Sequence, residues 1–317
     1  MSVTFQKAYK LTLGQFNTTD TFNVLTTIEQ LRFTANISVT AKNGTTITPE
    51  VSTIKIFNLP PETISTLTSS DDLYLEVKAG YLYENGKFNA TEDLPIVYFG
   101  SVVFIQTQNN ALDLITTFHC TPMHGKGSRA KANRVFTKGT KVREVFDYLA
   151  ETMNSAIAHD WEKVGDLILE GDKTLTGGSA KLIQDWAERF QLRVCHESSS
   201  VLRIIDKSVR DTGKQLHEIP LSNAKGYPEI VLDVSKVLKE GTTKTPDINV
   251  NTFLFPKIEI NDTIRVELID YTVPQVLGEY QTNYQDFIVN QYTHMLDSHE
   301  GGSNSWTTSI QGKGAQK

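Results

Sequence analysis

Apolar and polar side chains alternate without a break over residues 31–41, which places six apolar residues on one face of an extended chain. A period of two is typical of a β-strand with one buried face. The dipeptide Asn43-Gly44 follows and predicts a hairpin turn. Further alternating or apolar stretches cover 73–81, 96–106 and 112–120. The first 120 residues are therefore predicted to be mainly strands.

Three segments carry helix signals, either apolar residues spaced three and four apart or a proline suited to a first turn. The predicted helices are 61–67, 139–158 and 178–191. Thr140 has the residue type of an N-cap for the second of them. Two short strands, 192–196 and 201–205, follow as a predicted hairpin. Helices next to a hairpin indicate a small α+β unit.

The last hundred residues return to short strand-like stretches. The predicted strands are 229–238, 251–260, 263–271, 284–296 and 304–311, and 239–250 is predicted to be a polar loop. Threonine occurs 37 times, and β-branched residues favour strands. The predicted fold class is mainly β with a smaller α+β part. We expect three domains, at 1–135, 136–215 and 216–317.

The charge balance excludes a globally basic nucleic-acid-binding protein, because 31 Lys and Arg face 37 Asp and Glu, for a net charge of −6. The two cysteines, Cys120 and Cys195, do not imply a disulfide framework. No apolar run approaches the roughly 18 residues of a membrane span. The N-terminus lacks the apolar core of a signal peptide, so we expect folding in the cytoplasm.

The sequence offers no convincing catalytic, cofactor or metal motif. His119-Cys120 and His124 lie close together, but adjacent residues of a strand point to opposite faces. Asp185 and Glu188 fit the polar face of a predicted helix better than a glycosidase pair. No phosphate-binding glycine loop or Gly-x-Ser-x-Gly motif occurs. Six aromatic residues in strand contexts are expected to pack in cores rather than stack on bases: Phe5, Tyr9, Tyr81, Tyr98, Phe99 and Phe104.

One stretch of the chain is strongly basic. Its seven cations have no acidic residue between them: Lys126, Arg129, Lys131, Arg134, Lys138, Lys141 and Arg143. The rest of the chain therefore carries −13, which is −6 minus +7. Such an asymmetry can orient docking on an acidic protein partner. A solvated loop and helix start is the alternative interpretation.

Four separated stretches resemble the baseplate hub proteins of contractile phage tails, a family related to the N-terminal hub part of type VI secretion spike proteins. They are an aromatic-Asn-Leu segment before a short helix, two glycine-containing strand ends, a Gly-Thr segment before an amphipathic helix, and a C-terminal hairpin. Their order matches the family from about residue 30 to residue 311. The positions that carry the resemblance are Phe57, Asn58, Leu59, Gly80, Tyr81, Gly100, Gly139, His294 and Trp306.

The resemblance implies two tail-tube-like β-barrels joined by an α+β domain, assembled as a homotrimeric ring in a virion tail baseplate built in the host bacterial cytoplasm. Such a ring joins the six-fold tail tube to the three-fold central spike and lets DNA pass without specific binding. Implied partners are the tube or tube-initiator protein, the spike, and baseplate wedge and tape-measure proteins. The family has no catalytic residues at these positions, so the resemblance implies no enzyme and no cofactor.

Two other functions stay open on the sequence. A tail-associated cell-wall hydrolase would need convergent carboxylates or a nucleophile with a base. A carbohydrate-binding β-sandwich adhesin would present aromatic residues on loops rather than in strands.

Overall fold

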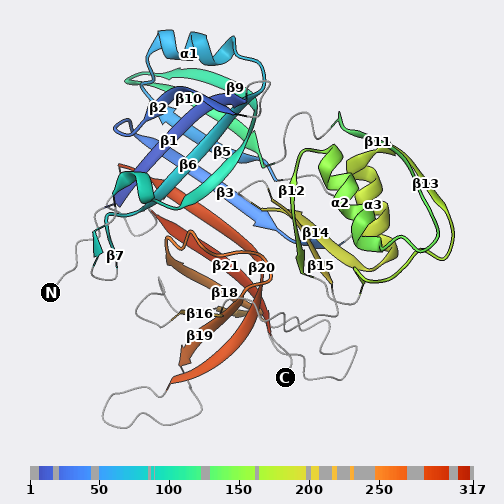
Figure 1. Cartoon of the computed structure of the whole chain (residues 1–317). Coiled ribbons are helices and arrows are strands. Elements are labelled where there is room, and N and C mark those ends of the chain that lie inside the picture. Colours follow the sequence, from blue (N-terminus) through green and yellow to red (C-terminus); the bar gives the residue numbers. More distant parts are fainter. Residues whose placement is uncertain are drawn as a thin grey trace.

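The computed structural model describes residues 7–16, 21–43, 50–84, 87–88, 90–122, 129–160, 164–197, 201–206, 216–219, 229–231, 247–269, 282–299 and 306–314. The chain is mainly β, as predicted, and the first and last parts of the chain share one sheet of thirteen strands (Figure 1). A separate lobe contains the two longer helices. None of the helices in the described ranges is long and apolar enough to cross a membrane.

The N-terminal part contributes seven strands to the large sheet: β1 (Lys7–Phe16), β2 (Phe22–Ile28), β3 (Phe33–Thr40), β5 (Ser52–Phe57), β6 (Leu73–Tyr81), β9 (Ile96–Asn110) and β10 (Asp113–Thr121). The chain does turn back after β3, since β5 pairs antiparallel with it. Its predicted turn residue Asn43 instead lies in β4 (Lys42–Asn43), and Gly44 lies outside the described residues. Short strands β7 (Tyr83–Glu84) and β8 (Lys87–Phe88) pair with each other, and the 3-10 turn η1 (Thr91–Asp93) precedes β9.

The three predicted helices are present, with α1 at Pro61–Thr68, α2 at Val142–Thr152 and α3 at Ser179–Arg189. Helix α2 is shorter than predicted at both ends. Its N-cap is Lys141 and not Thr140, because the chain is still extended at Lys141, which forms an isolated β-bridge with Ile168, and the Thr140 carbonyl accepts a hydrogen bond from Leu169 N. At the other end, Ala156–Asp160 forms strand β12, which pairs parallel with β15.

The lobe with α2 and α3 contains two small sheets. One is the ribbon of β11 (Lys131–Phe136) and β13 (Lys173–Gly178). The other has the order β12-β15-β14-β4, with β14 at Leu192–His196 and β15 at Val201–Asp206. The predicted hairpin of β14 and β15 is confirmed.

The C-terminal part adds six strands to the large sheet: β16 (Leu216–Ile219), β17 (Glu229–Val231), β18 (Asp247–Phe253), β19 (Thr263–Ile269), β20 (Thr282–Asp297) and β21 (Thr307–Gly314). Two predictions were wrong in this region. Strand β18 begins inside the predicted loop 239–250, and it ends at Phe253 rather than 260. Turns follow Phe253, where Pro256 has no backbone N–H for a ladder.

Strand β20 is shared between the two parts of the sheet. Its first half pairs with β19, and its second half, from Gln291 to Asp297, pairs with β3 of the N-terminal part. Along its other edge it pairs with β21. The N-terminal and C-terminal strands are therefore hydrogen-bonded into one continuous sheet.

Buried side chains form three cores. The first lies among the N-terminal strands and includes Leu296 and Trp306 from the C-terminal hairpin. The second joins α2 and α3 to one face of the β14–β15 sheet, with Phe146 and Ile183 fully buried. The third lies between the C-terminal strands and the opposite face of that sheet.

The described ladders do not close a barrel. The order of the large sheet runs from β17 to β2, and within the part of the chain that the structure describes β2 pairs only with β1. No closed barrel is therefore detected among the described strands.

The expectation of core packing holds for Tyr81 and Tyr98 but is wrong for Phe104, whose side chain is 58% exposed. Phe104 lies beyond the part of β9 that pairs with β6, and its ring stacks on His119 instead. Phe5 lies outside the described residues.

We predict that Trp306→Ala destabilises the chain by about 3–5 kcal/mol, since it leaves a large cavity in the first core. Trp306 is fully buried, its indole N–H donates to the Asp297 carbonyl at 2.9 Å, and its ring lies 6.1 Å from that of Tyr81. The free energy of unfolding in urea is the measurement. Met295→Ala, at a neighbouring side chain that is 44% exposed, should cost much less. Equal losses in the two variants would contradict the assignment of Trp306 to the core.

Candidate functional site

The main structural site is the joint between the helical lobe and the large sheet, where the β14–β15 hairpin packs against the third core. Strand β20 has a bulge between Val289 and Gln291. At this bulge the Asn290 carbonyl accepts a hydrogen bond from Ala41 N at 3.0 Å, and the Asn290 side-chain oxygen accepts one from Arg193 at 3.1 Å. Ala41 follows β3 and Arg193 lies in β14. The irregular position of β20 thus connects the large sheet to the helical lobe.

The β14–β15 hairpin forms the other side of the joint. Side chains alternate along each strand, so Val194 and Ile204 face the helices whereas Cys195 and Ile205 face the third core. Arg203 lies opposite Cys195 in the ladder and so projects toward the third core as well. A cation at a buried sheet face requires acidic partners.

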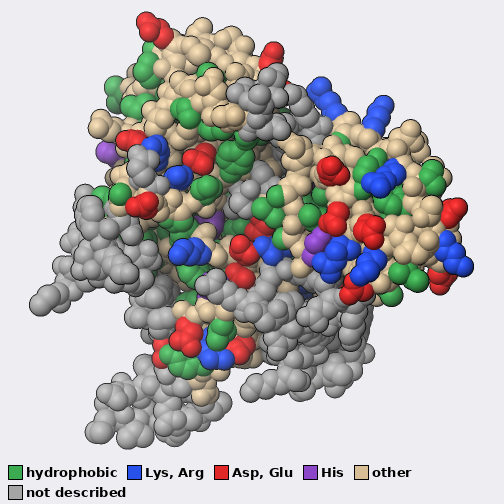
Figure 2. Space-filling model, in the orientation of Figure 1, with side chains coloured by type: hydrophobic (Ala, Val, Ile, Leu, Met, Phe, Trp, Pro, Cys, Tyr) green, Lys and Arg blue, Asp and Glu red, His purple; other side chains and the backbone are tan. Residues whose placement is uncertain are grey.

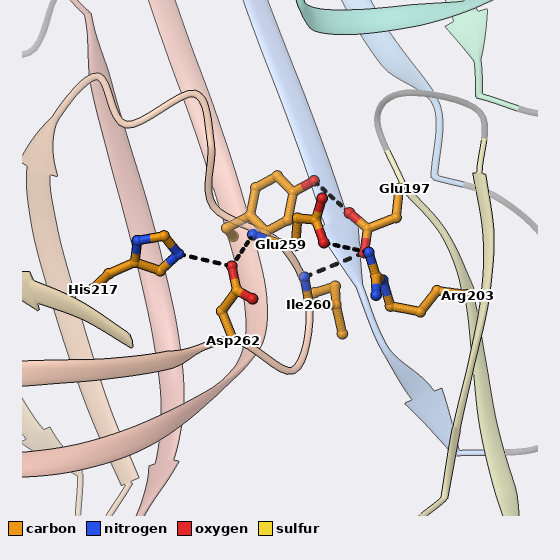
Figure 3. A network of polar contacts seen from close by, with 7 residues as sticks. Glu197, Arg203, His217, Glu259, Ile260 and Asp262 are labelled. Carbon is orange, nitrogen blue, oxygen red and sulfur yellow. Dashed lines mark hydrogen bonds and ion pairs between the residues drawn. The ribbon is translucent and has the colours of Figure 1, made fainter. Parts of the chain in front are cut away.

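Arg203 has those partners on both sides of the joint (Figure 3). Its Nε donates to Glu197 Oε1 at 2.5 Å, and its Nη2 donates to Glu259 Oε2. The side chains of Glu197 and Arg203 are 4% and 7% exposed, whereas that of Glu259 is 52% exposed. Glu197 also accepts hydrogen bonds from the Tyr292 hydroxyl at 3.1 Å and from the Ile260 N–H at 3.3 Å. The hairpin, β20 and the turn after β18 are therefore linked through one carboxylate.

A second buried contact fixes that turn. Asp262 Oδ2 accepts a hydrogen bond from Glu259 N at 2.8 Å and lies 3.0 Å from His217 Nε2 in β16. The backbone of Asp262 also accepts a hydrogen bond from Val289 N in β20. The turn that positions Glu259 for Arg203 is thus held by β16 and β20, as Figure 3 shows for His217 and Asp262.

Burial changes the proton affinity of groups at the joint and in the C-terminal hairpin. Burial raises the pKa of Glu197, while Arg203 acts in the opposite direction. Burial lowers the pKa of His196 to about 4 and that of His294 to about 3. Among the described residues, neither ring nitrogen of His196 has a hydrogen-bond partner. Both imidazoles are therefore neutral at physiological pH.

Three of the positions that carry the family resemblance form a corner between β5 and α1. Asn58 adopts a positive φ of 57°, a conformation that Asn tolerates better than most residues. Its side chain donates to Asp113 at 2.8 Å and accepts from Leu114 N at 2.9 Å. Leu59 is buried in the first core, and the Phe57 ring lies under the Arg32 guanidinium.

The other resemblance positions are dispersed. A Cβ on Gly100 would lie 2.4 Å from the Thr121 carbonyl oxygen, so the backbones approach there. His294 Nδ1 lies 2.9 Å from the Thr308 hydroxyl, inside the C-terminal hairpin. Tyr81 and Trp306 contact each other, Gly80 packs near Leu94, and Gly139 has a positive φ of 91° in the turn between β11 and α2. The structure places these residues at turns and core contacts, with no shared pocket built from them.

The basic run is divided in space. Arg129, Lys131 and Arg134 lie at or near β11 and are exposed. Lys141 Nζ pairs with Asp166 at 3.0 Å, and Lys138 N donates to Asp172. Arg143 is half-buried, and Lys126 lies outside the described residues. At the β11 end, Lys131 and Arg134 lie opposite Gly178 and Leu175 of β13, neither of which is acidic.

The candidate catalytic groups do not converge. Asp185 and Glu188 are exposed on α3, and Asp185 pairs with Lys181 at 2.7 Å. Cys120 is buried, and burial raises the pKa of its thiol. Within the described ranges, no three His, Cys, Asp or Glu side chains are grouped as metal ligands, and His124 lies outside those ranges.

Sequence reasoning missed the residues of the joint. The one available signal was Arg203, a cation inside the apolar strand 201–205. Glu259 lies inside the predicted strand 251–260, whereas Asp262 and His217 lie outside every predicted element, and only the fold brings the three to the hairpin.

We predict that Arg203→Met destabilises the chain by about 3–5 kcal/mol, because it leaves the Glu197 charge buried without a cation. The double variant Glu197→Gln with Arg203→Met keeps a hydrogen-bond acceptor for Tyr292 and removes the uncompensated charge. Its free energy of unfolding should therefore fall less than that of the single variant. Urea unfolding measures both. A single variant as stable as the parent protein, or a double variant less stable than the single one, would be inconsistent with a buried ion pair at the joint.

We predict acid sensitivity from the buried histidines. An unfolded histidine binds a proton below about pH 6.5, whereas folded His196 does so only near pH 4. The unfolded state therefore binds more protons in this range, and the unfolding free energy falls as pH decreases, by on the order of 1 kcal/mol per pH unit. His196→Leu should flatten this slope. His299→Leu, at an exposed histidine, should keep the parent slope, and identical slopes in all three proteins would refute the assignment.

No family model and no curated protein matches the chain. Solved structures with a similar fold do exist. The 43 kDa tail protein of prophage MuSo2 from Shewanella oneidensis has a TM-score of 0.55 and 8% identity, covering 97% of this chain and 98% of that one. A tail protein from Neisseria meningitidis MC58 has a TM-score of 0.55 and 12% identity, covering 98% of this chain and 97% of that one.

A third similar structure comes from the type VI secretion system. The E. coli c3393 protein, a component of that system with structural similarity to the T4 bacteriophage tail proteins gp27 and gp5, has a TM-score of 0.54 and 10% identity, covering 91% of this chain and 75% of that one. The chain thus shares its fold with phage tail proteins and with a type VI secretion component.

Proposed function

We propose that this protein is a structural baseplate hub of a contractile phage-type tail and makes or breaks no covalent bond. The observation that carries the proposal is the extent of the structural similarity. It covers almost all of this chain and almost all of two phage tail proteins, so it concerns the complete architecture rather than one common domain.

The internal construction supports a role in transmitting mechanical load. A shared strand holds the two parts of the large sheet together. The contacts of Arg203 with Glu259, of Glu197 with Tyr292 and of Arg193 with Asn290 hold the helical lobe to that sheet. An enzyme of this size would instead be expected to direct polar groups into a cleft. The candidate acids on α3 are exposed on a helix face.

In the proposed assembly, three copies form a ring around the DNA channel. Each copy supplies two tube-like β units, approximately 1–135 and 216–317, with 136–215 as the α+β domain between them. Six β units then match the six-fold tube, and the threefold ring matches the central spike. Sheet edges with no partner among the described strands, such as that of β2, would be completed by neighbouring copies, because exposed strand edges readily pair.

The proposed partners are the tube or tube-initiator protein on one side of the ring and the spike protein on the other. Baseplate wedge and tape-measure proteins would contact its periphery or channel, and DNA would pass without specific binding. The proposed location is the tail baseplate of a virion assembled in the cytoplasm of the bacterial host. The nine resemblance positions serve as turn and core residues in this proposal.

We predict that the purified chain, alone or with its spike protein, has a mass three times the chain mass of 35.5 kDa or a multiple of that value. Closed symmetric rings are the expected form of obligate oligomers. Light scattering after size exclusion, over a range of concentrations, measures the mass. A chain that stays monomeric both alone and with the spike protein would refute the hub proposal.

A further inference from the structure

The ribbon of β11 and β13 presents positive charge that its own ladder does not neutralise. The residues opposite Lys131–Val135 in β13 are Gly178, Gly177, Thr176, Leu175 and Thr174. None is acidic, although cross-strand neighbours are the usual partners of a charged strand residue. Lys131 and Arg134 are exposed, as is Arg129 just before the strand.

Arg134 is held in position by aromatic rings. Its guanidinium lies 5.0 Å from the ring centre of Phe136 and 5.1 Å from that of Tyr148. The Tyr148 hydroxyl accepts a hydrogen bond from Asn133 N at 3.2 Å, which fixes the second ring. A cation already oriented in this way loses less conformational entropy when it binds a carboxylate.

A surface of opposite charge lies on another part of the molecule. From 56 to 77 the chain contains four acidic residues and no Lys or Arg. Glu62, at the start of α1, and Asp71 and Asp72, shortly after its end, are exposed. Helix α1 covers one end of the N-terminal strands, whereas β11 lies on the helical lobe (Figure 1).

The two charged surfaces are separated within one copy. Figure 2 shows red side chains at the end of the molecule occupied by α1 and blue side chains projecting from the upper edge of the helical lobe. A closed ring requires each copy to carry two different, complementary surfaces, one for each neighbour.

We propose that Arg129, Lys131 and Arg134 of one copy dock on Glu62, Asp71 and Asp72 of a second copy of this chain. This inference rests on the proposed ring and adds the contact that sets its direction. Complementary charge favours head-to-tail encounter and disfavours like surfaces meeting.

The test is a charge swap read out as self-association by sedimentation velocity. The first variant is Lys131→Glu with Arg134→Glu, and the second is Glu62→Lys with Asp71→Lys. The third carries all four substitutions. Lys55→Glu with Lys257→Glu is the control for the first variant, since it changes the net charge equally at exposed positions elsewhere. Thermal unfolding verifies that each variant is folded.

Each reversed pair should weaken association at least about tenfold, and the four-substitution protein should recover most of the parent affinity. The control pair should associate like the parent. Raising salt from about 50 mM to about 500 mM should weaken the parent more than the first variant.

The outcomes separate this inference from the proposed function. If the parent forms the ring and both charge-reversed variants also assemble normally, the proposed contact is wrong but the proposed ring is not affected. Failure of the four-substitution protein to recover, with both pairs folded, would also overturn it. A parent that is monomeric under all conditions would overturn the ring and the contact together.

Discussion

The architecture depends on strand β20, which belongs to two parts of the molecule at once. It pairs with β19 at one end and with β3 at the other, and its side chains enter both the first and the third core. A one-residue slip of a hydrogen-bonded strand would turn every side chain to the other face of the sheet, so the register of this strand fixes both halves. The C-terminal hairpin consequently completes the core of the N-terminal strands, with Trp306 as its largest side chain.

The helical lobe is attached to this sheet by fewer but more specific contacts. The third core supplies apolar burial, while Arg203 between Glu197 and Glu259 determines which groups must face each other. A buried ion pair contributes little net stability compared with apolar packing, but a displaced arrangement would leave its charges uncompensated. The joint is therefore suited to keeping one relative placement of lobe and sheet.

Most strands and helices could be predicted from the sequence. Which strands pair across the two ends of the chain, and which core each side chain enters, could not. The alternating stripe at 31–41 identified β3, but not that Ile37 lies in the first core and Val39 in the third. Alternation specifies a buried face without specifying which partner covers it. The start of α2 was misplaced because Thr140 is hydrogen-bonded to Leu169, a backbone partner far along the chain. The end of β18 was misplaced because a turn follows Phe253. The joint was invisible for the same reason, since its residues come from segments far apart in sequence. The domain limits at 135 and 215, and the roles of the resemblance positions, stay predictions.

The central claim is that copies of this chain act as a scaffold closed around a hole. An electron-microscopic reconstruction of the purified assembly tests it most directly. We expect three copies around an open axis, with the β20 sheets of all copies forming the wall and the helical lobes joining neighbours. A compact particle without a central opening, or a ring in which the large sheets take no part in the wall, would contradict it.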